Sequence, residues 1–172
     1  MIPRAFAYER PGSVADAAGL LRRHGEGARI LAGGHSLLPM MKLRLAAPET
    51  LIDIGGISSL RGVTDAGSHL VIGALTTHAE LAGSELVRSA CPTLAHAAAS
   101  VGDMQVRNRG TIGGSLAQAD PHGDLPTVLL ALDGEVSAEG LDPPSDSAGS
   151  ADYRRHLARV LTRRALEEAS SG

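Results

Sequence analysis

The sequence is poor in cysteine and in aromatic residues. Cys91 is its single cysteine, tryptophan is absent, and aromatic residues make up 2% of the 172 residues. One cysteine excludes an internal disulfide, and it excludes an iron–sulfur cluster held by this chain alone. The hydrophobic core must therefore be built mainly from leucine, alanine, valine and isoleucine.

The sequence also lacks an excess of positive charge and a long apolar run. Lysine and arginine number 16 against 19 acidic residues, for a formal net charge of −3. This balance gives no electrostatic footprint for nucleic acid. No apolar run is long enough to cross a bilayer, and the start, "MIPRAFAYERPG", has no secretory apolar region. The predicted location is cytoplasmic.

The seven histidines do not show the spacing of a metal site. They stand at positions 24, 35, 69, 78, 96, 122 and 156. No pair has close helical spacing with acidic neighbours, so we expect no metal centre.

Two glycine pairs are the most informative feature that is present. The chain has 21 glycines, and residues 31–39 read "LAGGHSLLP" while residues 110–117 read "GTIGGSLA". A glycine turn that enters a helix presents several backbone N–H groups to an anion, and a diphosphate can use two such turns. Neither stretch is a Walker A or a G-x-G-x-x-G motif, so a simple tight turn remains the alternative.

The order of elements favours an α/β (α+β) fold. A short edge strand at 6–10, a helix at 13–25 and a buried strand at 28–32 lead into the first glycine turn, an order typical of a parallel unit. A short helical or irregular stretch (37–48), a buried strand (50–54) and a hairpin with its turn at 65–68 follow.

The rest of the chain is predicted to be mainly helical. We expect helices at 76–84 and 84–102, a polar approach to the second glycine turn, a helix at 125–132 and a strand at 134–138. Residues from about 140 read as a linker, and residues 151–169 form an amphipathic pattern.

Few side chains suggest catalysis. No G-x-S-x-G elbow is present, and the adjacency of His35 and Ser36 does not make a catalytic pair. Asp124 stands where a helix N-cap is expected. Arg107 and Arg109 suit either an anion or a solvated, ion-paired role.

Several stretches resemble a known family. The stretches "AGGHSLLPMMKLRLAAPETLIDI", "IGALTTHAEL", "QVRNRGTIGGSLAQADPHGDLP" and "LLALDGEV" resemble the FAD-binding medium subunit of aerobic, molybdenum-containing carbon monoxide dehydrogenases, and more broadly the flavoprotein part of the xanthine dehydrogenase family. The resemblance runs from Met1 to about Val136, and residues 145–169 resemble the end of the same subunit. A large internal deletion after about residue 137 is implied, with no counterpart here to the family's flavin-stacking residue.

The resemblance implies a PCMH-type FAD-binding domain. It would consist of a small parallel βαβ N-terminal subdomain and a second, truncated subdomain of mixed or antiparallel α+β structure. The division is 1–138 for this domain, 139–150 for a linker and 151–169 for a C-terminal helix.

The resemblance also implies the site and the role. The FAD-binding residues it implies are Ala32, Gly33, Gly34, His35, Ser36, Thr111, Ile112, Gly113, Gly114, Ser115 and Asp124. For Asp124 a contact to the flavin nucleotide then outweighs capping. No side chain is expected to be catalytic, because the protein orients a cofactor that does the chemistry.

The implied function is an oxidoreductase flavoprotein subunit. It would carry electrons from the iron–sulfur small subunit of a complex with a molybdopterin large subunit, through FAD, to a quinone or another acceptor. Such a complex would be cytoplasmic or lie at the inner face of the membrane. The alternatives are a truncated, non-catalytic remnant that docks on partner subunits, and a general nucleotide-binding module.

Overall fold

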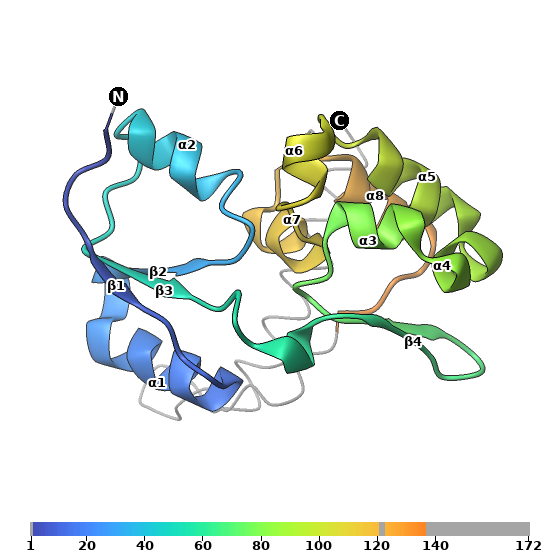
Figure 1. The fold of residues 1–172 in the computed structure, drawn as a ribbon, viewed down its shortest axis with the longest axis horizontal. Coiled ribbons are helices and arrows are strands. Elements are labelled where there is room, and N and C mark those ends of the chain that lie inside the picture. Colours follow the sequence, from blue (N-terminus) through green and yellow to red (C-terminus); the bar gives the residue numbers. More distant parts are fainter. Residues whose placement is uncertain (1, 121–122, 137–172) are drawn as a thin grey trace. The chain divides into compact units, whose positions relative to one another are not determined.

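The computed structural model describes residues 2–120 and 123–136 (Figure 1). The chain divides into two compact units, residues 1–114 and 115–172, which we describe separately. No helix among the described residues is long and apolar enough to cross a membrane.

The first unit begins with a three-stranded parallel sheet. Strands β1 (Ala7–Glu9) and β2 (Ala28–Leu31) flank the central strand β3 (Thr50–Asp53). Buried residues occupy most of β3, whereas β1 and β2 are edge strands and are largely half-buried or exposed. The predicted parallel unit and the edge position of β1 are confirmed.

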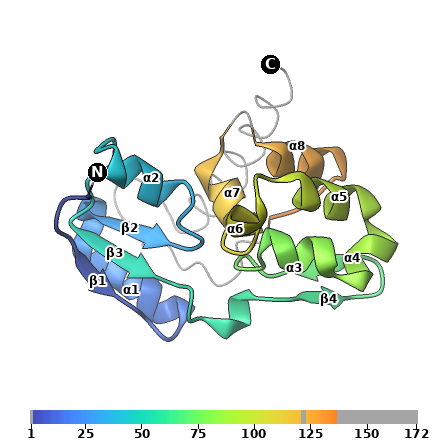
Figure 2. The same cartoon turned by 45° about the horizontal axis from the view of Figure 1, so that its top comes forward.

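Helix α1 (Val14–His24) lies against one face of this sheet (Figure 2). The Ser13 side chain caps it by accepting a hydrogen bond from the Asp16 N–H. Gly25 ends it with φ +55°, a left-handed conformation that favours glycine. A short 3₁₀ turn, η1 (Gly25–Gly27), then leads into β2. The apolar cluster between α1 and the sheet is made by Ala17, Ala28, Ile52 and Ile57.

The first glycine pair and a hairpin follow in chain order. The loop 32–36 joins β2 to α2 (Leu37–Lys42), as predicted. After β3, the 3₁₀ turn η2 (Ser58–Leu60) leads to the antiparallel strands β4 (Val63–Asp65) and β5 (Leu70–Ile72). The Asp65 carboxylate accepts the Gly67 N–H at 2.7 Å in the hairpin turn. The hairpin prediction is confirmed.

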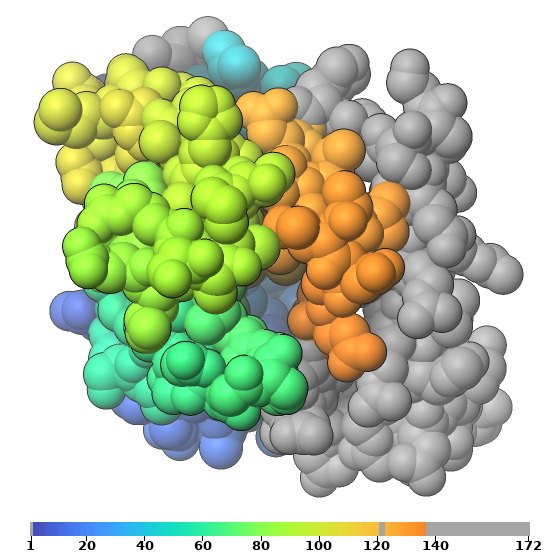
Figure 3. All heavy atoms as spheres, turned by 90° about the vertical axis from the view of Figure 1, so that its right-hand side faces the viewer, coloured from blue at the N-terminus to red at the C-terminus, as the bar shows by residue number. Residues whose placement is uncertain are grey.

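Four helices complete the first unit. They are α3 (His78–Gly83), α4 (Glu85–Ala90), α5 (Pro92–Ser100) and α6 (Met104–Arg107). Helix α3 packs on α5, and α4 packs on α5 and on the hairpin, so that helices and hairpin share a continuous surface (Figure 3). The single helix predicted at 84–102 is wrong. Pro92 has no N–H to continue α4 and instead begins α5.

Helix α7 (Ile112–Gln118) runs from the first unit into the second, and α8 (Asp124–Ala131) follows. The second glycine pair is therefore not a turn, because Gly113 and Gly114 belong to the first turn of α7. Gly123 takes the N-cap position of α8 and Asp124 is its first helical residue, so Asp124 does not take the capping role that was the alternative to a nucleotide contact.

The predicted strand at 134–138 is not formed over its described residues, 134–136. The predicted linker (139–150) and C-terminal helix (151–169) lie outside the described residues, and the predicted domain division stays a prediction.

Candidate functional site

The first glycine pair turns the chain sharply between β2 and α2. Gly34 has φ +79°, which other residues adopt only with strain. Its carbonyl oxygen accepts the Leu38 N–H at 2.9 Å, and a Cβ on Gly34 would lie 2.9 Å from the Leu38 Cδ1. Glycine is therefore required here by the backbone conformation.

The backbone N–H groups of this loop are not used by the part of the chain that the structure describes. None of the N–H groups of residues 33–36 donates a hydrogen bond to another described residue. Ser36 is exposed and stands at the N-cap position of α2, where its side chain makes no capping hydrogen bond. The His35 Nδ1 lies 3.1 Å from the Gly33 carbonyl oxygen. The loop thus has several N–H donors without a described acceptor, and donors of this kind can bind an anion.

The second glycine pair has a different environment. The Ile112 N–H donates to the Thr76 carbonyl at 3.0 Å, and the Gly113 N–H donates to the Ala74 carbonyl at 2.9 Å. The Thr111 hydroxyl accepts the Gly114 N–H at 3.1 Å. The first two bonds hold α7 on the segment before α3, and the third is a cap from Thr111, so that all three donors are occupied.

Gly113 is required by packing. A Cβ on Gly113 would lie 2.6 Å from the Ala74 Cβ and 2.7 Å from the Ala74 carbonyl oxygen. Contacts this short do not occur in folded proteins, so any other residue would move α7 away from Ala74.

The two motifs meet at Gly33. A Cβ on Gly33 would lie 2.2 Å from the Arg109 carbonyl oxygen and 2.9 Å from the Gly110 Cα. The first loop thus lies against the peptide that directly precedes Thr111. Of the predicted site residues, those at 32–36 and 111–114 belong to one unit and are brought together there.

Ser115 and Asp124 belong to the second unit. Ser115 is half-buried within α7, and Asp124 is exposed at the first position of α8. A carboxylate in the first turn of a helix interacts favourably with the helix dipole.

The structure separates the roles of the two arginines. The Arg107 guanidinium donates to the carbonyl oxygens of Val101 and Gly102, at 3.2 and 2.9 Å, at the end of α5. Arg109 is exposed, and its guanidinium makes no hydrogen bond or ion pair with another described residue. Within the described chain, Arg109 therefore does not take the ion-paired role that was one of its alternatives.

His78 is a residue of this site that the sequence analysis did not identify. It is 2% exposed, and a Cβ on Gly110 would lie 2.8 Å from the ring atoms Cδ2 and Nε2. Burial lowers the pKa of His78, and the nearby His35 lowers this pKa further. No motif spacing marks His78, because its neighbour Gly110 is 32 positions away in the chain.

Comparison with known proteins defines the family. The family described as "FAD binding domain in molybdopterin dehydrogenase" matches residues 4–148. The chain belongs to this family. The predicted family, the mixed α/β fold and FAD as the family's cofactor are thereby confirmed.

Individual members of the family are similar over most of this chain. The carbon monoxide dehydrogenase medium chain of Hydrogenophaga pseudoflava is 51% identical over 140 residues, 81% of this chain and 49% of that protein. The 6-hydroxypseudooxynicotine dehydrogenase complex subunit alpha of Paenarthrobacter nicotinovorans is 45% identical over 141 residues, 82% of this chain and 48% of that protein.

A solved structure has the same fold. The carbon monoxide dehydrogenase from Hydrogenophaga pseudoflava that lacks the Mo-pyranopterin moiety of its cofactor superposes with a TM-score of 0.75 at 53% identity. The superposition covers 76% of this chain and 46% of that one. The chain therefore spans about half the length of the curated relatives it matches.

The residues of the first unit fit the diphosphate of FAD. A dinucleotide carries its negative charge on the diphosphate, and the unused N–H groups at 33–36 are neutral donors suited to it. Glycine at 33 lets the loop lie against the Arg109–Gly110 peptide, and glycine at 34 allows the positive φ of the turn.

Proposed function

We propose that this chain is the FAD-carrying subunit of a molybdenum hydroxylase complex, with the FAD diphosphate bound on the loop 32–36. The observation that carries the proposal is the contrast between the two glycine pairs. No residue in the described ranges accepts the N–H groups of the first pair, whereas those of Ile112, Gly113 and Gly114 are hydrogen-bonded within the chain.

In this proposal the two motifs act differently on the cofactor. The first loop donates hydrogen bonds to the diphosphate, with the Ser36 hydroxyl as a further donor. The second motif lies beside the diphosphate with Thr111, Ile112, Gly113 and Gly114. Ser115 and Asp124 contact the nucleotide, as the family resemblance implies. When bound, FAD would supply the capacity to accept and transfer electrons. The protein itself binds and orients the cofactor.

The first experiment measures FAD binding to the purified chain. We expect protein-shifted flavin absorption bands and saturable binding in a titration followed by flavin fluorescence. A correctly folded chain that neither contains flavin nor takes it up would contradict the proposal.

The proposed partners are an iron–sulfur small subunit and a molybdopterin large subunit. Support comes from the relatives, one of which is named as a subunit of a dehydrogenase complex. The single cysteine also means that clusters must belong to another chain. We expect a reduced iron–sulfur partner to bleach the flavin absorption of the FAD-loaded chain under anaerobic conditions, with a quinone restoring it.

A non-catalytic docking module is the second candidate. It follows from the family resemblance, which implies no counterpart in this chain to the family's flavin-stacking residue. The same experiments separate the two functions, because a docking module binds the partner subunits in a pull-down and leaves FAD unbound or unreduced.

A further inference from the structure

We propose that His78 is a positioning residue that holds the Arg109–Gly110 peptide against the first glycine loop and so sets the geometry of the diphosphate site. The inference rests on the proposed FAD function and adds a residue that none of the glycine motifs contains. Its support comes from three successive layers of contacts within the first unit.

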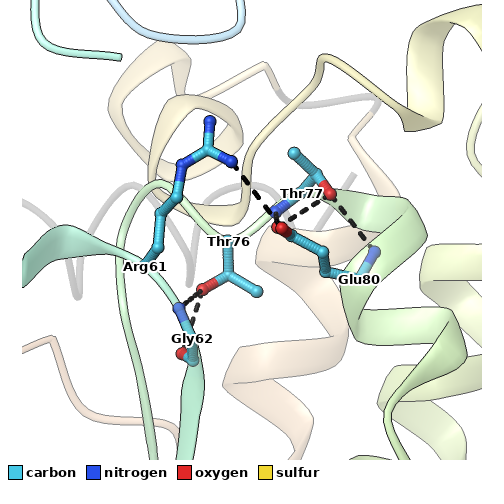
Figure 4. A network of polar contacts seen from close by, with 5 residues as sticks. All are labelled: Arg61, Gly62, Thr76, Thr77 and Glu80. Carbon is cyan, nitrogen blue, oxygen red and sulfur yellow. Dashed lines mark hydrogen bonds and ion pairs between the residues drawn. The ribbon is translucent and has the colours of Figure 1, made fainter. Parts of the chain in front are cut away.

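The first layer fixes the start of α3, where His78 is the first residue. Thr77 and Glu80 form a capping box, in which the Glu80 carboxylate accepts the Thr77 N–H at 2.7 Å and the Thr77 hydroxyl accepts the Glu80 N–H at 3.2 Å (Figure 4). The Arg61 guanidinium lies 3.7 Å from the Glu80 carboxylate. This arrangement leaves His78 little freedom to move.

A neighbouring contact ties the same segment to the chain before the hairpin. The Thr76 hydroxyl accepts the Gly62 N–H at 2.9 Å and donates to the Gly62 carbonyl at 3.0 Å (Figure 4). Thr76 is 1% exposed, so both bonds are shielded from water.

The second layer joins His78 to Gly110 through both backbone and ring. The His78 N–H donates to the Gly110 carbonyl at 3.0 Å. The ring lies so close to Gly110 that a methyl group there would come within 2.8 Å of it. Gly110 is buried and is thus held from two directions.

The third layer is the contact of the Arg109–Gly110 peptide with Gly33. Because a Cβ on Gly33 would lie 2.2 Å from the Arg109 carbonyl oxygen, a small shift of this peptide displaces the first loop. Because the pKa of His78 is lowered, its ring is neutral near pH 7. The ring therefore positions the peptide through van der Waals contact and adds no positive charge to the diphosphate site.

The test uses the full chain and three flavin or nucleotide ligands. FAD and ADP-ribose contain the diphosphate, whereas riboflavin does not. We expect His78→Ala to weaken the binding of FAD and ADP-ribose by a common factor of about ten or more, and to leave riboflavin binding unchanged. His69→Ala is the matched control, because His69 is an exposed histidine in the hairpin turn of the same unit.

A double-mutant cycle separates positioning from general support of the core. Gly110→Ala pushes a methyl group against the ring and should also weaken FAD binding. Removing the ring gives that methyl group space, so His78→Ala/Gly110→Ala should bind FAD more tightly than Gly110→Ala alone. Purely additive losses would overturn the proposal.

Other results also decide the question. If His78→Ala has a normal melting transition and binds FAD and ADP-ribose with affinities within twofold of the wild type, the proposed role of His78 is overturned. The proposed function is then left intact. If His78→Ala does not fold, an unchanged affinity of Gly110→Ala overturns it. Absence of FAD binding by the wild-type chain overturns the proposed function itself.

Discussion

At the scale of single residues, glycines that look equivalent in the sequence have different physical reasons. Gly34 supplies a positive φ, Gly33 allows close approach of another peptide, and Gly113 allows α7 to pack on Ala74. The pattern "GG" predicted all three as parts of anion-binding turns. The N–H groups of the first pair have no acceptor among residues 2–120 and 123–136, whereas those of the second pair do, because the fold places carbonyl and hydroxyl oxygens beside them.

Replacing Gly33 by alanine tests the contact with Arg109. The added methyl group would lie 2.2 Å from a backbone oxygen, which cannot move aside as a side chain does. We expect FAD affinity to fall by at least about tenfold, with lower stability. Gly19→Ala is the control, because a Cβ there meets nothing within 4 Å. In the middle of α1 it should raise the free energy of unfolding by about 0.5–1 kcal/mol and leave FAD affinity unchanged.

The charge on Arg109 gives a second prediction at this scale. Its guanidinium has no described partner, and its own carbonyl oxygen lies beside Gly33. If it contacts the diphosphate, Arg109→Gln should weaken FAD binding by about three- to tenfold and make log Kd less dependent on salt. Arg88→Gln is the control, because Arg88 is paired with Glu85 at 3.2 Å on α4. Equal salt dependence in both variants would contradict the contact.

The lowered pKa of His78 predicts a pH dependence of stability. Burial makes the folded-state pKa of His78 lower than its unfolded value, so the unfolded chain binds the proton more readily. The free energy of unfolding should therefore fall as the pH drops below about 6.5, by at most about 1.4 kcal/mol per pH unit from this group. Denaturant titrations of the wild type and His78→Gln between pH 7.5 and 5 measure the difference, for which we expect a smaller pH dependence in the variant.

At the scale of elements, the sequence predicts the sheet and the hairpin well because their signals are local. Ser13 and Gly25 mark both ends of α1, and Asp65–Gly67 marks the hairpin turn. The helix at 84–102 was predicted without its break, although Pro92 carried the necessary signal. Pro92 has no N–H to continue α4 and begins the next helix instead.

The surroundings of the second glycine pair were beyond sequence-based prediction. Glycine disfavours helix interiors, so "TIGG" indicates a turn from local propensity alone. The helix α7 forms because Ala74 and Thr76 supply carbonyl oxygens for its first N–H groups and Thr111 caps it. Thr76 and Ala74 lie 36 and 39 positions before Ile112 and Gly113, and tertiary contacts of this kind override local propensity. The same reason explains why His78 was missed.

The cap of α3 gives a prediction for this scale. Thr77→Ala removes the side-chain oxygen that accepts the Glu80 N–H and should lower the free energy of unfolding by about 1 kcal/mol. Because α3 carries His78, we also expect weaker FAD binding. Ser13→Ala removes the corresponding cap of α1 and should cost a similar amount of stability without an effect on FAD affinity. Thermal unfolding and FAD titration of both variants make the comparison, and equal FAD affinities would show that α3 does not position the site.

At the scale of the whole molecule, this chain aligns with about half the length of its relatives. The aligned part contains both glycine motifs. Within its first unit, the described contacts bring the loop 32–36 against the Arg109–Gly110 peptide, and this supports the proposed diphosphate site. The chemistry that distinguishes FAD from other diphosphates lies in the flavin ring and its contacts. The binding energy contributed by the diphosphate and the preference for FAD over other diphosphates can thus be measured separately.

ADP-ribose and ATP measure this separation. If the first loop contributes most of the binding energy, ADP-ribose should displace FAD from this chain with a Kd within about tenfold of that of FAD, since both contain the same diphosphate. ATP has a terminal triphosphate where FAD has a diphosphate bridged between two sugars, so it should compete far less well. Competition titrations followed by flavin fluorescence measure all three Kd values. Tighter binding of ATP than of FAD would instead indicate a general nucleotide-binding module, and a failure of ADP-ribose to compete would place the dominant contacts on the flavin.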